Sequence, residues 1–387
     1  MSSTTTTENT SVRRRHDERR LPWYHLLLTG LAGLLVAIAI LAIFDGLSIA
    51  SAIVLGFLLH LVFGYTYSRI REGRRWAMDR LMMLTVIGAF AVSMFPLLSL
   101  LWEVVGRGLV RAVEAAPTPF SFWTDSMSGV IGGADAGGVL HAAVGTLLIT
   151  LWASIISIPI GLFTAIFLVE YADVGWRRVL GQGVTFLVDV MTGIPSIVAG
   201  LFGLALFIAF MPDDSVRMGI MGAVALSLLM IPTVVRSSEE MLRLVPMDLR
   251  EASYALGVPK WLTIVKVVLR TAIAGLTTGV TLAIARVIGE TAPLLLTVGM
   301  VTGVNWNMFD GRMATLPTFI NQQYRAGSAN CMNDTVRNPI TDEVYNCSIT
   351  TNIDRAWAAA FTLILIVMVL NIVARLVSYY FSPKLSR

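Results

Sequence analysis

Long apolar runs recur along the chain, separated by polar segments that are rich in arginine. A helix needs about 20 consecutive apolar residues to cross a bilayer, and these runs have that length. We predict eight membrane-spanning helices, at residues 21–44, 47–67, 81–104, 139–169, 184–211, 218–235, 271–300 and 356–381. The expected fold class is an all-α, polytopic membrane protein. Its first two spans form a hairpin, because only a short turn separates them.

The composition agrees with this pattern and excludes several other classes of protein. The 387 residues are 56% apolar and 14% charged, whereas an ordinary soluble domain has about 25% charged residues. A disordered chain, a disulfide scaffold and most soluble enzymes are therefore excluded. Two cysteines and four scattered histidines form no zinc motif. Basic residues at the membrane edges, rather than along one surface, predict no binding of nucleic acid.

The distribution of positive charge predicts the orientation of the spans. With a cytoplasmic N-terminus and alternating spans, most of the 29 Lys and Arg residues fall in cytoplasmic segments, as the positive-inside rule requires. The cytoplasmic segments are then the basic tail 1–20, a linker at 68–80 and a loop at 236–270, and the outside segments are 105–138 and 301–355. Both termini are expected in the cytoplasm. The run at 21–44 is too long for a signal peptide, so we expect a retained span.

No segment of the chain is suited to nucleotide binding. A Walker A loop ends in Gly-Lys-Ser/Thr, because its lysine reaches the terminal phosphates. The three lysines, Lys260, Lys266 and Lys384, follow Pro, Val and Pro. We therefore expect no enzyme activity and no cofactor in this chain. If ATP drives the protein, another chain binds the ATP and its Mg²⁺.

The cytoplasmic loop contains a short predicted helix. Pro246 suits the beginning of a helix, and Asp248 favours its positively polarised end. Gly257 suits the left-handed residue that follows the last turn. Such a helix either caps the bundle as an ordinary surface element or serves as a contact for another protein.

The residues of this helix resemble a known signature. Glu251, Ala252 and Ser253, followed by Gly257, are similar to the EAA-x3-G signature of ABC importer permeases, although Arg270 replaces the proline that closes the signature. In that family the helix docks into the ATPase subunit and couples ATP hydrolysis to the spans. The resemblance assigns these four residues to ATPase coupling.

Two further segments resemble the phosphate permeases of the PstA type. These are residues 285–295, which read ARVIGETAPLL, and residues 193–203, which read GIPSIVAGLFG; Leu316-Pro317 and residues 370–375 also fit. The resemblance covers about 140–380 and implies the transmembrane domain of a type I ABC importer. We expect its six-span core within 81–383, after an additional transmembrane hairpin at 21–67.

The resemblance also implies what the chain would do and with which partners. It implies the permease subunit of an ATP-driven importer of inorganic phosphate in the bacterial inner membrane. The implied partners are a second permease of the PstC type, two ATPase subunits of the PstB type and an extracytoplasmic binding protein of the PstS type. Membrane lipid surrounds the spans. The alternatives that remain are a permease for sulfate or molybdate and a secondary anion transporter driven by an ion gradient.

The candidate substrate path lies in the span at 271–300. Arg286 is expected about 22 Å along a hydrocarbon core of about 30 Å, where an ionised residue needs a partner, water or a protein interior. If the helix is continuous, Glu290 is next to Arg286 on the same face. That face would consist of Gly275, Gly279, Arg286, Glu290, Pro293 and Thr297. The two charges either neutralise each other in a helix interface or line a path on which Arg286 binds phosphate.

The remaining candidates are less specific. Pro195 interrupts a span, and Ser196 beside it can donate a hydrogen bond, so the pair either lines the path or only kinks a helix. Thr291 belongs to the path by resemblance alone. Asp189 is expected to pair with a basic side chain. Cys331 and Cys347 both fall outside the membrane, where an oxidising compartment permits a disulfide; two free thiols are the alternative.

Overall fold

The computed structural model describes most of the chain. The described residues are 21–22, 24–43, 48–114, 118–130, 133–211, 216–329, 331, 334–337 and 344–381. The predicted basic tail 1–20 and most of the predicted turn between the first two spans lie outside them. By internal contacts the chain divides into two compact units, Met1–Leu101 and Trp102–Arg387. The boundary thus falls inside a helix, rather than at the predicted start of the permease domain at residue 81.

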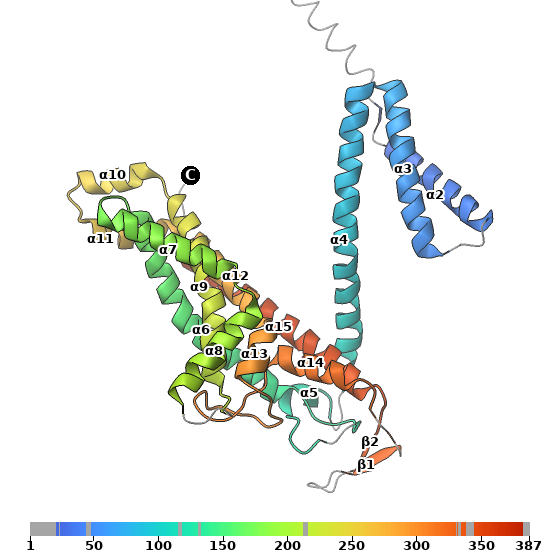
Figure 1. The fold of residues 1–387 in the computed structure, drawn as a ribbon. Helices are drawn as coiled ribbons and strands as arrows, with labels where there is room; N and C mark the ends of the chain where they lie inside the picture. Colours follow the sequence, from blue (N-terminus) through green and yellow to red (C-terminus); the bar gives the residue numbers. More distant parts are fainter. Residues whose placement is uncertain are drawn as a thin grey trace, which may run out of the picture. The chain divides into compact units, whose positions relative to one another are not determined.

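Within its described residues, the first unit contains three long helices. These are α2 (His25–Ile43), α3 (Ile49–Arg71) and α4 (Arg74–Val113), the last of which continues into the second unit. Helices α2 and α3 lie side by side (Figure 1). A Cβ atom at Gly33 would lie 2.8 Å from both the carbonyl oxygen of Gly56 and the backbone nitrogen of His60. The two backbones approach this closely because the contact residue has no side chain.

Most of the segment 68–80, which the sequence predicts to link two spans, is helical. Arginine is a good helix former, so α3 continues to Arg71 and α4 begins at Arg74. The break is confined to Glu72 and Gly73, and Gly73 adopts φ +97°. The carboxylate of Glu72 accepts hydrogen bonds from Arg80 at 2.6 Å and from Ser68 at 2.8 Å. These bonds tie the end of α3 to the beginning of α4.

The second unit is a helical bundle with α9 at its centre (Figure 1). Its elements are α5 (Ser121–Thr124), α6 (Leu140–Ile166), η1 (Phe167–Tyr171), α7 (Trp176–Thr192), α8 (Ser196–Phe210), α9 (Gly219–Arg243), α10 (Met247–Ala255), α11 (Lys260–Thr263), η2 (Ile264–Val268), α12 (Leu269–Ile288), α13 (Ala292–Thr297), α14 (Leu316–Ala326), β1 (Thr335–Arg337), β2 (Val344–Asn346) and α15 (Thr351–Phe381). Helices α6 and α12 both pack against α9. The core between them includes Ile149, Leu226, Met230 and Val287, all almost fully buried.

Hydropathy supports the predicted number of spans. Among the described residues, seven helices are long and apolar enough to cross a membrane, and the pair α7–α8 meets the same test as an eighth. Residues 184–211 do not form one continuous helix, because α7 and α8 are bent by 108° at the break before Pro195, where the sequence predicts an interruption. The chain turns at Gly193 and Ile194, and Pro195 becomes the N-cap of α8. Proline has no backbone N–H to continue the first helix.

The helix assumed to be continuous over 271–300 is interrupted. Helix α12 ends at Ile288, Gly289 forms its C-cap, and a separate short helix α13 follows. Glu290 therefore lies beyond the end of α12, and the single face predicted for Arg286 and Glu290 does not exist. The first half of the prediction is correct: a Cβ atom at Gly275 would lie 2.3 Å from the sulfur of Met241 on α9. Small residues do let α9 approach here.

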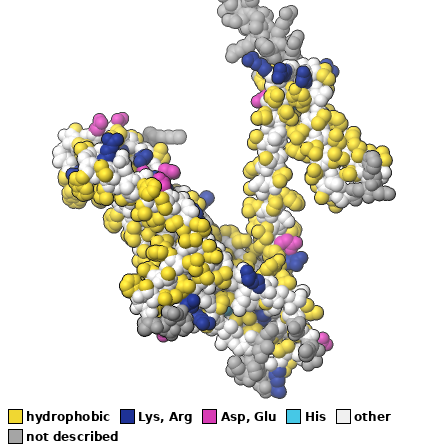
Figure 2. All heavy atoms as spheres, in the orientation of Figure 1, with side chains coloured by type: hydrophobic (Ala, Val, Ile, Leu, Met, Phe, Trp, Pro, Cys, Tyr) yellow, Lys and Arg dark blue, Asp and Glu magenta, His cyan; other side chains and the backbone are white. Residues whose placement is uncertain are grey.

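The two ends of the second unit differ in character. Helices α10 and α11 lie at one end, and the antiparallel pair β1–β2 lies at the other (Figure 1). Side chains of Lys, Arg, Asp and Glu gather at the α10–α11 end, whereas hydrophobic side chains cover the surface between the ends (Figure 2). This banding is what a bilayer around the middle of the unit requires.

Candidate translocation path and coupling surface

Two interrupted helices meet in the second unit. Helix α8 begins after the break at Pro195, and α13 begins after the break at Gly289. A Cβ atom at Gly200 on α8 would lie 2.6 Å from the Cα atom of Pro293 on α13. The fold therefore packs the helices that begin at Ser196 and Ala292 directly against each other. Two candidate segments that are about 95 residues apart in the sequence are thus brought together.

The candidate residues at these breaks are accessible. Pro195 is exposed, and Ser196, Glu290 and Thr291 are half-buried. Thr291 is the N-cap of α13, and the backbone N–H of Glu290 donates to the carbonyl oxygen of Val287 at 3.1 Å. Interrupted helices at membrane depth are tolerated where they line a cavity or are covered by protein.

Arg286 is exposed on the surface of this chain. Within the described residues no ion pair joins it to Glu290, so a mutually neutralising pair does not account for it. The exposed residues Thr278, Leu282 and Arg286 follow one another at intervals of four, which places them on one face of α12. If this face of α12 contacted lipid, placing the charged guanidinium of Arg286 in the hydrocarbon core would cost free energy. This face of α12 therefore needs water or another protein subunit against it.

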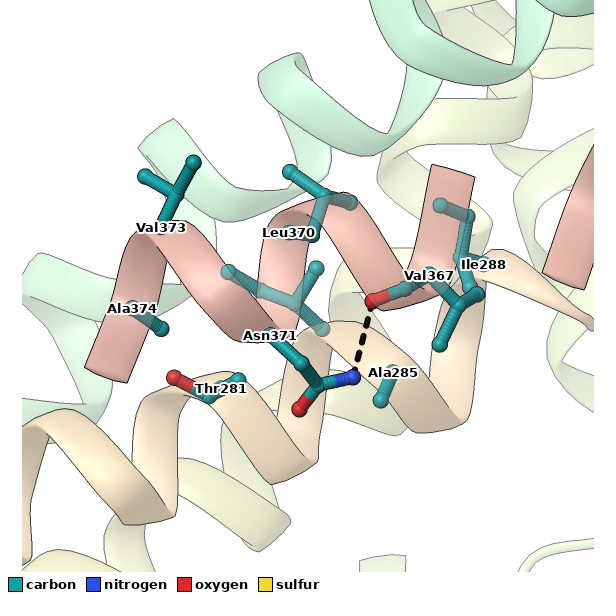
Figure 3. Close-up of a pocket in the computed structure, with 9 residues that line it drawn as sticks. Thr281, Ala285, Ile288, Val367, Leu370, Asn371, Val373 and Ala374 are labelled. Carbon is teal, nitrogen blue, oxygen red and sulfur yellow. Dashed lines mark hydrogen bonds between the residues drawn. The ribbon is translucent and has the colours of Figure 1, made fainter. Parts of the chain in front are cut away.

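A small pocket lies on a different side of α12, where α15 packs against it (Figure 3). Its volume is about 160 Å³, and apolar side chains such as Ile284, Ile288 and Leu370 line most of it. The Asn371 side chain extends from α15 toward α12 and donates to the carbonyl oxygen of Val367 at 2.8 Å. Thr281 donates to its own helix as well. With no cationic side chain in its lining, this pocket is unsuited to an inorganic anion.

The helix predicted between residues 246 and 257 is α10. Pro246 is its N-cap, Asp248 lies in its first turn, and Gly257 adopts φ +75° just beyond its end. Glu251 and Ala252 are exposed, whereas Ser253 is buried and its hydroxyl lies 2.8 Å from that of Thr263. This segment and the residues beside it also expose large apolar side chains, at Leu244, Met247, Leu249, Leu256 and Trp261. Exposed apolar side chains of this kind on a loop between two spans mark a contact for another protein.

Sequence reasoning missed the pair that anchors α10. Arg250 is buried, and its Nε and Nη2 atoms donate to one oxygen of Glu170 at 3.1 and 2.9 Å. Nη2 also donates to the carbonyl oxygen of Leu242 at 2.9 Å, so one side chain holds together η1, α9 and α10. An acidic residue at the end of the apolar run 139–169 is the signal that was available. Burial, and secondarily the negative charge of Glu170, raises the pKa of the neighbouring Tyr254.

A second ionic network lies between α7 and α9. Arg236 on α9 pairs with Asp189 on α7 and donates to Glu239 at 2.9 Å. Arg243 also pairs with Glu239, which is almost fully buried. Asp189 therefore has a basic partner, as the sequence suggests. The network joins the first half of the interrupted pair α7–α8 to the centre of the bundle.

A disulfide organises the end of the unit at which β1 and β2 lie. Cys331 and Cys347 are joined, with their Cα atoms 5.8 Å apart. A Cβ atom at Gly133 would lie 2.8 Å from the sulfur of Cys347, so the loop at 133–137 passes directly against the disulfide. The buried guanidinium of Arg355 donates to the carbonyl oxygens of Ala134 and Ala136. The disulfide, this loop and the beginning of α15 thus form one connected structure.

This bundle, with its interrupted helices and a short helix between spans, defines a multi-pass membrane component of a transport system. Comparison with known proteins gives the family: residues 157–387 match the family described as "Binding-protein-dependent transport system inner membrane component". The chain belongs to that family. The predicted fold class, an all-α polytopic protein with the transmembrane domain of a type I ABC importer, is confirmed.

Individual relatives show which members of this family the chain resembles. The "Phosphate transport system permease protein PstA 1" of Mycobacterium tuberculosis (strain ATCC 25618 / H37Rv) is 43% identical over 291 residues, which are 75% of this chain and 84% of the relative. The PstA proteins of Mycobacterium leprae and Yersinia pestis are 42% and 33% identical, over 73% and 80% of this chain and 83% and 92% of the relatives. The resemblance to PstA-type permeases is therefore confirmed. Among solved structures, the inward-facing MetNI methionine ABC transporter matches with TM-score 0.45 and 17% identity, over 64% of this chain and 95% of that chain.

Proposed function

We propose that this chain is the permease subunit of an ATP-driven importer of inorganic phosphate and that its path for phosphate runs along the face of α12 that carries Arg286. The relatives named above are phosphate permeases, which supports phosphate rather than sulfate or molybdate as the cargo. Arginine chemistry alone does not separate these anions, because each offers several oxygens to a planar pair of donors.

The main observation that supports this proposal is that Arg286 is exposed on the surface of the chain. A second permease subunit, of the PstC type, would cover the face of α12 that this chain leaves open and complete the path. Phosphate carries one to two negative charges near pH 7, so a guanidinium is its natural contact. The half-buried carboxylate of Glu290, two residues beyond the helix end, would keep that contact weak enough for release. Ser196 and Thr291, at the two breaks, would supply further hydrogen bonds.

The exposed face of α10 is proposed to dock on an ATPase subunit of the PstB type, where ATP and Mg²⁺ would bind. Glu251, Ala252 and Gly257 border this face, and Ser253 holds it to Thr263. The outer loops at 105–138 and 301–355 would meet a binding protein of the PstS type. This arrangement places both termini in the cytoplasm and the disulfide outside the inner membrane, in agreement with the distribution of Lys and Arg.

Phosphate uptake by the reconstituted complex tests the proposal. Arg286→Gln is expected to lower uptake about tenfold to a hundredfold, because charge-assisted hydrogen bonds contribute about 1.5–3 kcal/mol. Arg286→Lys should restore it only in part, since lysine keeps the charge and loses the planar pair of donors. Arg375→Gln removes another exposed charge, near the end of α15, and serves as the matched control.

Three outcomes would contradict the proposal. Normal uptake in Arg286→Gln would remove this residue from the path. Uptake in vesicles that contain no ATPase subunit would indicate a secondary transporter. Efficient competition by sulfate or molybdate would assign a different oxyanion as the cargo.

A further inference from the structure

An open pocket of about 390 Å³ lies between α7, η1 and α9, toward the α10 end of the second unit. Four polar side chains of α7 line it, at Arg178, Gln182, Thr185 and Asp189, together with Glu239 and Arg243 of α9. The apolar part of its lining includes Leu168 and Phe186, and Phe186 is 70% exposed. The pocket thus combines charged groups with an accessible apolar wall.

Helix α7 is amphipathic, and its two faces differ in what they contact. The four polar residues follow one another at intervals of four, three and four, which places them on one face. The opposite face presents Trp176, Val179, Leu187 and Val190, each at least 49% exposed. A basic, amphipathic helix with an exposed tryptophan at one end is typical of an element at the boundary between lipid and water.

Among the described residues that line the pocket, one cation has no ionic partner. Arg236 pairs with Asp189, and Arg236 and Arg243 both pair with Glu239, so each carboxylate already has a basic partner. Within the described part of the chain Arg178 takes part in no ion pair. Its guanidinium stands at the pocket beside the amide of Gln182 and the hydroxyl of Thr185, which lie on the following turns. Three kinds of donor face one opening, and this set matches a phosphate group.

We propose that this pocket binds the headgroup of an anionic phospholipid from the leaflet at the α10 end of the unit. The lipid phosphate contacts Arg178, Gln182 and Thr185, and the acyl chains follow the apolar wall of the pocket at Leu168 and Phe186. A free phosphate ion would leave that apolar surface uncovered, whereas a phospholipid satisfies both parts of the pocket. The bound lipid fixes α7, and through α7 the break at which Ser196 begins α8.

Lipid binding to the purified full-length chain, measured by native mass spectrometry, tests the proposal. Phosphatidylglycerol is expected to bind about tenfold or more tightly than phosphatidylcholine. Arg178→Gln should abolish that preference. Arg177→Gln removes the same charge from the neighbouring position, which does not line the pocket, and should keep the preference. Thr185→Val weakens the same contact without changing any charge, so it provides an independent reading if Arg178→Gln fails to fold.

The outcomes separate the two sources of a phosphate group. Equal preference in the Arg178 and Arg177 variants, or no effect of Thr185→Val, would overturn the site. If excess inorganic phosphate displaces phosphatidylglycerol from the wild-type chain but not from Arg178→Gln, the pocket binds the free ion and the lipid assignment is wrong. Retention of phosphatidylglycerol in excess phosphate supports the lipid.

Discussion

Replacing Glu170 by glutamine removes the charge that balances Arg250 and keeps the size of the side chain. The two side chains are only 5% and 7% exposed. Removing one partner of a buried ion pair costs about 3–5 kcal/mol, because the other charge is left without compensation. Arg250 keeps the carbonyl oxygens of Leu242 and Val245 as acceptors, so we take the lower end, about 3 kcal/mol. That cost shifts the equilibrium between the attached and detached α10 about a hundredfold.

The measurement compares the phosphate transported per ATP hydrolysed in proteoliposomes, together with hydrogen exchange at the amides of α10. We expect Glu170→Gln to lower the transport ratio and to speed exchange at α10. Glu103→Gln is the matched control, since Glu103 pairs with Arg107 at 2.7 Å while both side chains are about half exposed. An exposed pair contributes about 0–1 kcal/mol. A normal transport ratio and unchanged exchange in Glu170→Gln would refute the view that this pair anchors α10.

Two further predictions concern α10 and the outer loop. Gly257 has φ +75° and open space around a Cβ atom, so the cost of substituting it is conformational. Phosphate uptake should fall more for Gly257→Val than for Gly257→Asn, because asparagine tolerates positive φ better. Equal losses of uptake in the two variants would contradict this explanation. In intact cells, a membrane-impermeant thiol reagent should label Cys331 and Cys347 only after reduction, and should miss a cysteine introduced by Lys260→Cys until the membrane is permeabilised. The opposite pattern would reverse the proposed orientation.

Features with a local cause were predictable from the sequence. Hydropathy alone located the spans, since a helix must be apolar over about 20 residues to cross a bilayer. Pro246, Asp248 and Gly257 act within a few residues of themselves, so both ends of α10 could be placed. Opposite charges at Asp189 and among the nearby arginines were enough to expect a pair.

The features that the sequence did not predict depend on contacts between segments that are distant in the sequence. Glu170 and Arg250 are 80 residues apart, and no local pattern relates them. Helix α12 ends at Ile288, and α13 packs on α8 at Gly200. Counting residues along an ideal, continuous helix predicted that Glu290 shares a face with Arg286, and the break at Gly289 rules this out. Pro195 indicated an interruption in the span at 184–211, but membrane helices are apolar on all sides, and therefore periodicity could not show how large the bend is.

The bend between α7 and α8 has a consequence for biosynthesis. At about 1.5 Å per residue, α7 is about 26 Å long and α8 about 22 Å long, and each is shorter than a hydrocarbon core of about 30 Å. Neither half is therefore a complete stop signal for a translocon that releases helices into lipid one at a time. Small residues of α9, at Ala225 and Gly222, receive α8 and the residues around α13. We therefore expect this region of the chain to insert as a group of helices, after α9 has been synthesised.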